Sequence, residues 1–129
     1  MLRNLAVILV LGSVIILLLG ACGSASSPTS ITSNAVHMNS TQFVQASVTI
    51  KKGERLTLID DASTPHIIAN GTWEQGEAKA ATEPGAPQVN DVQIPGNDSR
   101  TIGPFTVAGT FKLYCPIHSG MNLTVQVVE

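Results

Sequence analysis

The sequence contains little charge of either sign and no cluster of basic residues. Lys and Arg together number seven and Asp and Glu nine in 129 residues, for a formal net charge of −2 with neutral histidines. Without a basic patch, the charge pattern gives no sign of a nucleic-acid partner. A chain of this length, with little charge and many Gly and Pro residues, has room for one modest globular domain at most.

Helical periodicity is also missing after Ala35. Apolar and polar residues alternate instead at residues 55–59, and a turn containing Gly53 separates them from another strand-like segment, residues 47–50. The same alternation returns at residues 123–127, and turn signals recur along the chain. We therefore predict an all-β fold, for which an antiparallel sandwich is the most economical architecture.

Residues 73–99 show no clear pattern of either kind. They mix Pro and Gly with isolated apolar residues, and we expect a long excursion with one edge strand or a short helical turn. Loops of this length inside compact domains are often functional, so we expect the excursion to cover or flank a site. Trp73, at its start, is either a packing residue or a contact residue, and the sequence does not separate the two.

The one long apolar run lies at the N-terminus. Arg3 supplies a positive charge, residues 5–19 are apolar apart from Gly12 and Ser13, and small residues precede Cys22. This pattern is typical of a signal peptide. An uncleaved transmembrane anchor is the alternative, but the run is short for crossing a bilayer and no basic cluster follows it.

The residues that end at Cys22 resemble a processing site. Leu19-Gly20-Ala21-Cys22 is similar to the lipobox of bacterial lipoproteins, and the resemblance implies that Cys22 is diacylated and becomes the mature N-terminus. Two acyl chains would hold a small domain stably at a membrane. Residues 1–21 are then a lipoprotein signal peptide, residues 22–34 a flexible Ser/Thr-rich tether, and residues 35–129 the folded domain. We expect this domain outside the cytoplasm, in the periplasm or its equivalent, attached to the cell membrane.

Cysteine is scarce, and this makes Cys115 informative. With Cys22 acylated, Cys115 has no disulfide partner within the chain. A lone thiol in an oxidising compartment needs an explanation, and metal ligation is a good one. Phe111, Leu113 and Cys115 share one parity of a strand pattern, so we expect the Cys115 side chain to point inward from the end of a buried strand.

Two further potential ligands follow Cys115 at intervals of three. His118 and Met121 lie in the same short stretch, and one tight loop at the end of a strand can turn all three side chains toward one point. His66, directly after Pro65, supplies a second imidazole. A thiolate, two imidazoles and a thioether are the ligand set of a blue-copper site. Singly, each residue also has an ordinary explanation: Cys115 and Met121 as core packing, and His66 as a loop histidine.

Residues 35–129 resemble cupredoxins of the plastocyanin, azurin and amicyanin kind. Residues 110–121, TFKLYCPIHSGM, are similar to the family's terminal segment G-x-Y-x-Y-x-C-x-x-H-x-x-M, with the short spacing of amicyanin. Residues 48–54 resemble the family's early hairpin. The resemblance implies a Greek-key β-sandwich and one mononuclear type 1 copper that cycles between Cu(II) and Cu(I). The copper ligands that it implies are His66, Cys115, His118 and Met121.

The function that the resemblance implies is one-electron transfer rather than enzymatic catalysis. We expect a monomeric, membrane-tethered carrier that exchanges electrons with membrane-associated donor and acceptor proteins. His118 is expected to present its ring edge to solvent within an apolar surround that includes Pro116 and Ile117. A nitrite reductase or multicopper oxidase would need more histidines than the three present, and a binuclear centre would need a second cysteine in the loop.

Two alternatives use the same side chains for another purpose. Copper delivery or storage at the cell surface would need the same ligands, with Cu(I) handed on to an acceptor. A structural zinc site suits one Cys and two His, but Met is a poor fourth ligand for zinc. His37 lies near the first strand with no partner spacing, and we expect it in a surface or core role.

The sequence departs from the family pattern at two positions. Ile67 stands where an Asn usually follows the first ligand histidine and ties the two ligand loops together. Pro116 directly follows Cys115, and a proline offers no N–H beside the thiolate sulfur. Because such hydrogen bonds tune the metal, the reduction potential of relatives does not transfer to this chain.

Overall fold

The computed structural model describes residues 34–129 of the chain. The predicted signal peptide, Cys22 and all but the last residue of the predicted tether lie outside the described residues. Nine strands and no helix occur within residues 34–129. Accordingly, no helix in this part of the chain has the length and apolar character needed to cross a membrane.

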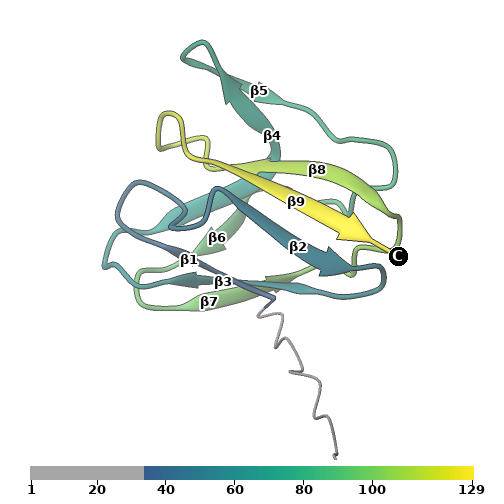
Figure 1. Ribbon diagram of the computed structural model, residues 1–129. Coiled ribbons are helices and arrows are strands. Elements are labelled where there is room, and N and C mark those ends of the chain that lie inside the picture. Colours follow the sequence, from purple (N-terminus) through teal and green to yellow (C-terminus); the bar gives the residue numbers. More distant parts are fainter. Residues whose placement is uncertain (1–33) are drawn as a thin grey trace, which may run out of the picture. The chain divides into compact units, whose positions relative to one another are not determined.

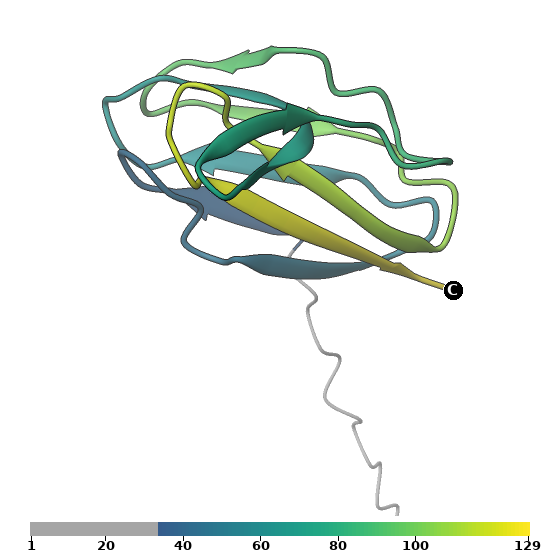
Figure 2. The ribbon, with the colours of Figure 1, turned by 90° about the horizontal axis from the view of Figure 1, so that it is seen from above.

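The nine strands form two sheets (Figures 1 and 2). Strand order is β1-β3-β7 in the three-stranded sheet and β2-β9-β8-β4-β5 in the other, where β6 also pairs with β4. The strands are β1 Ala35–Met38, β2 Ser47–Lys51, β3 Leu56–Asp60, β4 His66–Glu74, β5 Glu77–Ala80, β6 Val92–Ile94, β7 Ser99–Ile102, β8 Gly109–Tyr114 and β9 Asn122–Val128.

The all-β sandwich is confirmed, but its sheets are mixed rather than purely antiparallel. β1 pairs with β3 in parallel, and β2 pairs with β9 in parallel. The turn at Gly53 is present, with Glu54 N–H donating to the Lys51 carbonyl, yet it joins strands of different sheets instead of closing a hairpin. Residue alternation reports which face of a strand is buried but carries no information on strand direction. The prediction was therefore correct in its layers and in most strand pairs, and wrong only for β1 with β3 and β2 with β9.

The core lies between the two sheets and consists of side chains of alternating parity. Leu56 and Leu58 of β3 are fully buried, as are Phe111, Leu113 and the following Cys115 at the end of β8. Lys112 faces solvent as expected, but Tyr114, of the same parity, is buried. Its ring packs against the backbone of Gly71 on the neighbouring strand β4, where a Cβ would lie 2.7 Å from Tyr114 Cε1. A side chain at residue 71 would therefore collide with Tyr114.

The excursion at residues 73–99 contains more strand than predicted. It holds the end of β4, all of β5 and all of β6, and no helical turn occurs in it. β6 pairs with the start of β4, with Ile94 opposite His66, so the excursion flanks the predicted site as expected. His37 lies on β1, half-exposed, with Nδ1 2.7 Å from Asp61 Oδ2, which agrees with a surface role.

Candidate metal centre

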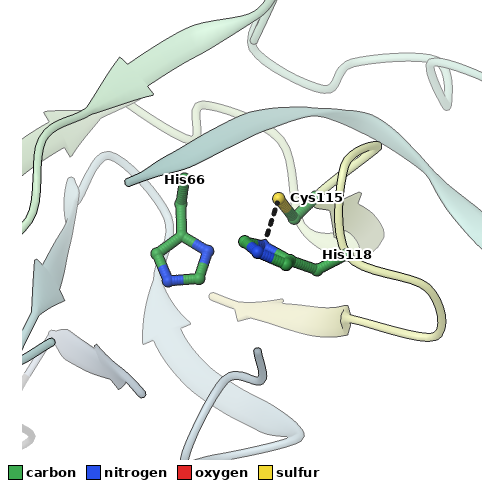
Figure 3. A group of neighbouring side chains, drawn as sticks. All are labelled: His66, Cys115 and His118. Atoms are coloured by element: carbon green, nitrogen blue, oxygen red, sulfur yellow. Dashed lines mark hydrogen bonds between the residues drawn. The ribbon is translucent and has the colours of Figure 1, made fainter. Parts of the chain in front are cut away.

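Three of the four predicted ligands converge at one end of the domain. His66 is the first residue of β4, Cys115 follows the last residue of β8, and His118 lies in the loop between β8 and β9. One ligand atom from each of these residues lies within 4.8 Å of the others (Figure 3). Residues 49 or more positions apart in the sequence thus meet, because β4 and β8 are neighbours in the same sheet.

The loop from Cys115 to Met121 is closed by its own backbone. Tyr114 and Asn122 are opposite one another in the β8–β9 register. Inside this frame, Cys115 N–H donates to the Met121 carbonyl at 3.1 Å, His118 N–H to the Cys115 carbonyl at 3.3 Å, and Met121 N–H to the His118 carbonyl at 3.2 Å. Two of these bonds join residues three positions apart, and the bond between Cys115 and Met121 joins the two ends of the loop, so the three candidate ligand residues are held together.

His66 is held with one ring nitrogen available. The residue is buried, and its Nε2 donates to the backbone carbonyl of Asn39 at 2.8 Å. A proton on Nε2 leaves the lone pair on Nδ1, which is buried without a hydrogen-bond partner among the described residues. An unpartnered buried acceptor is costly, and a metal ion would satisfy it. The orientation and the tautomer of His66 therefore both suit metal binding.

Cys115 and His118 face one another. Cys115 Sγ lies 3.4 Å from His118 Nδ1 (dashed line in Figure 3), and the thiol is fully buried. The His118 ring is also 4.8 Å from the His66 ring, measured between centroids. Desolvation, followed by the neighbouring His66, lowers the pKa of His118, while Asp60 opposes the shift. The neutral imidazole, which is the form that binds metals, is thereby favoured.

Met121 is fully buried at the end of the same loop. Its burial agrees with a role as a weak axial ligand and equally with core packing. The complete donor set, a thiolate, two imidazoles and a thioether, fits copper better than zinc, which takes four stronger ligands.

A profile described as "copper binding proteins, plastocyanin/azurin family" matches residues 30–128. This chain belongs to the plastocyanin/azurin family of copper-binding proteins. Copper is therefore the metal of this cupredoxin. The family assignment and the sandwich predicted from the sequence are both confirmed.

Individual relatives of the cupredoxin are distant. It is 28% identical over 85 residues to the chloroplast plastocyanin of Silene latifolia subsp. alba, a match that covers 66% of this chain and 50% of the relative. The match thus spans about half the length of that protein. Amicyanin from Paracoccus versutus has a TM-score of 0.51 at 21% identity, covering 81% of this chain and 87% of amicyanin. A purple cupredoxin from Nitrosopumilus maritimus scores 0.52 at 19% identity, covering 73% and 98%.

Trp73 ties the ligand loop of this cupredoxin to β4. Its indole Nε1 donates to the Cys115 carbonyl at 2.9 Å. Asn122, directly after Met121, accepts a hydrogen bond from Trp73 N–H at 2.7 Å and donates to the Trp73 carbonyl at 3.0 Å. Ile67 has no polar group for the tie expected of an Asn, so these bonds provide a different connection. Trp73 is half-buried and makes a specific hydrogen bond within the domain.

The sequence reasoning missed Asn39 and Asp60. Asn39 contributes through its backbone carbonyl, which leaves no signature in the residue type. Asp60 did leave one, because it shares the parity of Leu56 and Leu58 and should therefore be buried. A carboxylate at a core-facing position of a strand is unusual and marks a residue that deserves a functional explanation.

Proposed function

We propose that this cupredoxin is an electron carrier whose single type 1 copper is bound by His66, Cys115, His118 and Met121. The observation that carries the proposal is the buried convergence of His66, Cys115 and His118, with the Nδ1 of His66 lacking any other partner among the described residues. Bound copper would supply the one-electron chemistry by alternating between Cu(II) and Cu(I). Enzymatic catalysis is not part of the proposal.

The protein's contribution is to hold the ligands still in both oxidation states. His66 is fixed by the Asn39 carbonyl, and the loop backbone is fixed by the three hydrogen bonds among Cys115, His118 and Met121. Trp73 connects that loop to β4. Ligands held by the fold need little rearrangement when the charge of the metal changes, and small rearrangement favours fast electron transfer.

Electron exchange is proposed to occur at the His118 side. His118 is half-buried, and its neighbour Ile117 is 54% exposed. Ile117 also borders a surface hollow of about 300 Å³ lined mainly by apolar residues, namely Pro65, His66, Ile67, Gln93, Ile94, Pro95 and Ile117. Exposed apolar surface rimmed by polar residues is typical of protein contacts. A redox partner that covers this face would approach the copper through His118.

Attachment to the cell membrane completes the proposal. The lipobox resemblance at Cys22 supports acylation, which would keep the monomeric carrier on the outer side of the cytoplasmic membrane beside membrane-associated donors and acceptors. Labelling with a radioactive fatty acid in a bacterial host tests this part alone: the wild type is expected to incorporate label and Cys22→Ser to incorporate none. Label in both would refute the anchor.

The electron-carrier proposal is tested by visible absorption and electron paramagnetic resonance of the full-length protein, purified in detergent and loaded with Cu(II). We expect an intense thiolate-to-copper charge-transfer band that disappears on reduction and returns on oxidation through many cycles. Loss of the copper to a competing chelator during cycling would favour copper delivery. A colourless protein that prefers Zn(II) would refute both copper functions.

A further inference from the structure

Asp60 is a buried carboxylate with an unsatisfied oxygen. It is the last residue of β3, and its side chain has no exposed surface. Oδ1 accepts a hydrogen bond from Ala62 N–H at 2.9 Å, whereas Oδ2 has no hydrogen-bond partner within residues 34–129. A buried carboxyl group with an orphaned oxygen is costly and calls for an explanation.

The only ionisable side chain of residues 34–129 at ion-pair distance from Asp60 is His66. The Oδ1 atom of Asp60 is 3.9 Å from Nε2 of His66, and no Lys or Arg of the described residues pairs with this carboxyl group. The proton on Nε2 is donated to the Asn39 carbonyl at 2.8 Å, so the carboxylate stands beside that N–H without accepting it. Asn39 therefore orients the ring, and an ionised Asp60 would add negative charge there rather than a hydrogen bond.

The electrostatic effect of that charge differs between the two oxidation states. A thiolate and two neutral imidazoles bring one negative charge, so the proposed copper site carries one net positive charge when oxidised and none when reduced. An anion in a buried environment, little screened by water, favours the more positive state. We propose that the Asp60 carboxylate is the counter-charge of the oxidised copper site and lowers its reduction potential. This inference rests on the proposed function.

A purely structural role for Asp60 can be separated from the electrostatic one. Its hydrogen bond to Ala62 N–H holds the start of the loop between β3 and β4. In Asp60→Asn, the amide oxygen can keep this bond and the shape hardly changes, but the negative charge is gone. A positioning effect through loop structure would survive the substitution, whereas a counter-charge would not.

The experiment measures the reduction potential, and separately the Cu(II) and Cu(I) dissociation constants, of full-length wild type and Asp60→Asn. We expect the preference for Cu(II) over Cu(I) to fall about tenfold, which for one electron is a rise in potential of about 59 mV. The charge-transfer band and the paramagnetic resonance spectrum should keep their wild-type form. Asp61→Asn is the matched control: its carboxylate is 55% exposed and bonded to His37, so its removal should change the preference less than twofold.

Three outcomes would overturn the inference. The first is an unchanged potential in a blue Asp60→Asn variant, and the second is an equal change in Asp60→Asn and Asp61→Asn. The third does not need Asp60→Asn, which keeps the test valid if that variant does not fold. Reduced-minus-oxidised infrared spectra with ¹³C-labelled aspartate should contain a carboxylate band that Asp61→Asn, Asp91→Asn and Asp98→Asn each retain, which leaves Asp60 as its source; a protonated carboxyl band, no aspartate band, or a band lost in one of these variants would refute the counter-charge. If wild type shows no charge-transfer band, the proposed function itself fails.

Discussion

The two imidazoles proposed to bind copper lie in different surroundings. His66 is buried, fixed by the Asn39 carbonyl and flanked by the Asp60 carboxylate. His118 is half-buried, next to the exposed Ile117, and its position depends on a seven-residue loop that closes on itself. Under the two proposals above, the His66 side sets the electrostatics of the metal and the His118 side offers access. The reduction potential and the route of the electron would then depend on different sides of one site.

The largest effect is expected from removing the Cys115 thiolate, because the copper charge-transfer band depends on it. In Cys115→Ala, we expect the charge-transfer band to vanish completely while the sandwich stays folded, because the apolar alternation of β8 and β9 is unchanged. Visible absorption and circular dichroism of the copper-loaded variant check the two halves of this expectation. A variant that stayed blue would show that the ligand assignment is wrong.

The difference in access between His66 and His118 can be tested by replacing each histidine with Gly and adding free imidazole. His118→Gly would leave a gap near the surface, and added imidazole should restore the charge-transfer band. His66→Gly would leave a gap at a buried residue beside β6 and remove the donor to the Asn39 carbonyl, so added imidazole should restore at most a small fraction. Titration of both copper-loaded variants with imidazole provides the measurement. Equal recovery would mean that the two sides do not differ in access.

Trp73 connects β4, which carries His66, to the loop that carries His118, and a substitution can weaken this connection. Trp73→Phe removes the indole N–H that donates to the Cys115 carbonyl. That carbonyl keeps its bond from His118 N–H, so we expect a loss of roughly 1 kcal/mol or less in the unfolding free energy of the metal-free protein. Chemical denaturation measures it. A loss several times larger would indicate that Trp73 acts mainly through packing.

The smallest expected effect is that of His118 protonation on the stability of the metal-free protein. Desolvation lowers the pKa of His118 from its ordinary value of 6.5, with His66 contributing. A histidine whose folded-state pKa is lowered takes up its proton more readily in the unfolded chain, so the metal-free protein should lose some stability as the pH falls below about 6.5. Proton NMR titration of metal-free protein, with His118→Gln for assignment, should place the His118 midpoint below 6.5. A midpoint above that value would contradict the expected sign.

The sequence was sufficient for the parts of the site that depend on local spacing. Cys115, His118 and Met121 lie in one loop, so their residue types and intervals indicated a shared point without knowledge of the fold. His66 could be added because proline and strand signals surround it. Parity also predicted the burial of Cys115. Each of these inferences used residues within a few positions of one another, where backbone geometry limits the outcomes.

The features of the fold and the site that the sequence did not predict depend on contacts between distant segments. Parallel pairing of β2 with β9 joins residues more than 70 positions apart, and nothing in either strand's alternation specifies direction. His66 and Trp73 donate to the backbone carbonyls of Asn39 and Cys115, and the residue type of an acceptor does not predict a bond to its backbone. Asp60 could have been found from its core parity, but its position 3.9 Å from His66 follows only from the fold, which brings the end of β3 to the start of β4 in the other sheet.

Strand β5 has a consequence for the behaviour of the protein in concentrated solution. It ends the larger sheet, all four of its residues are exposed, and no other strand of residues 34–129 pairs with its outer edge. Edge strands of this kind can template association, and charged side chains oppose it. Glu77 and Lys79 place one charge of each sign along β5. Neutral substitutions of Glu77 and Lys79 would not alter the candidate copper ligands, and their expected effect is lower solubility.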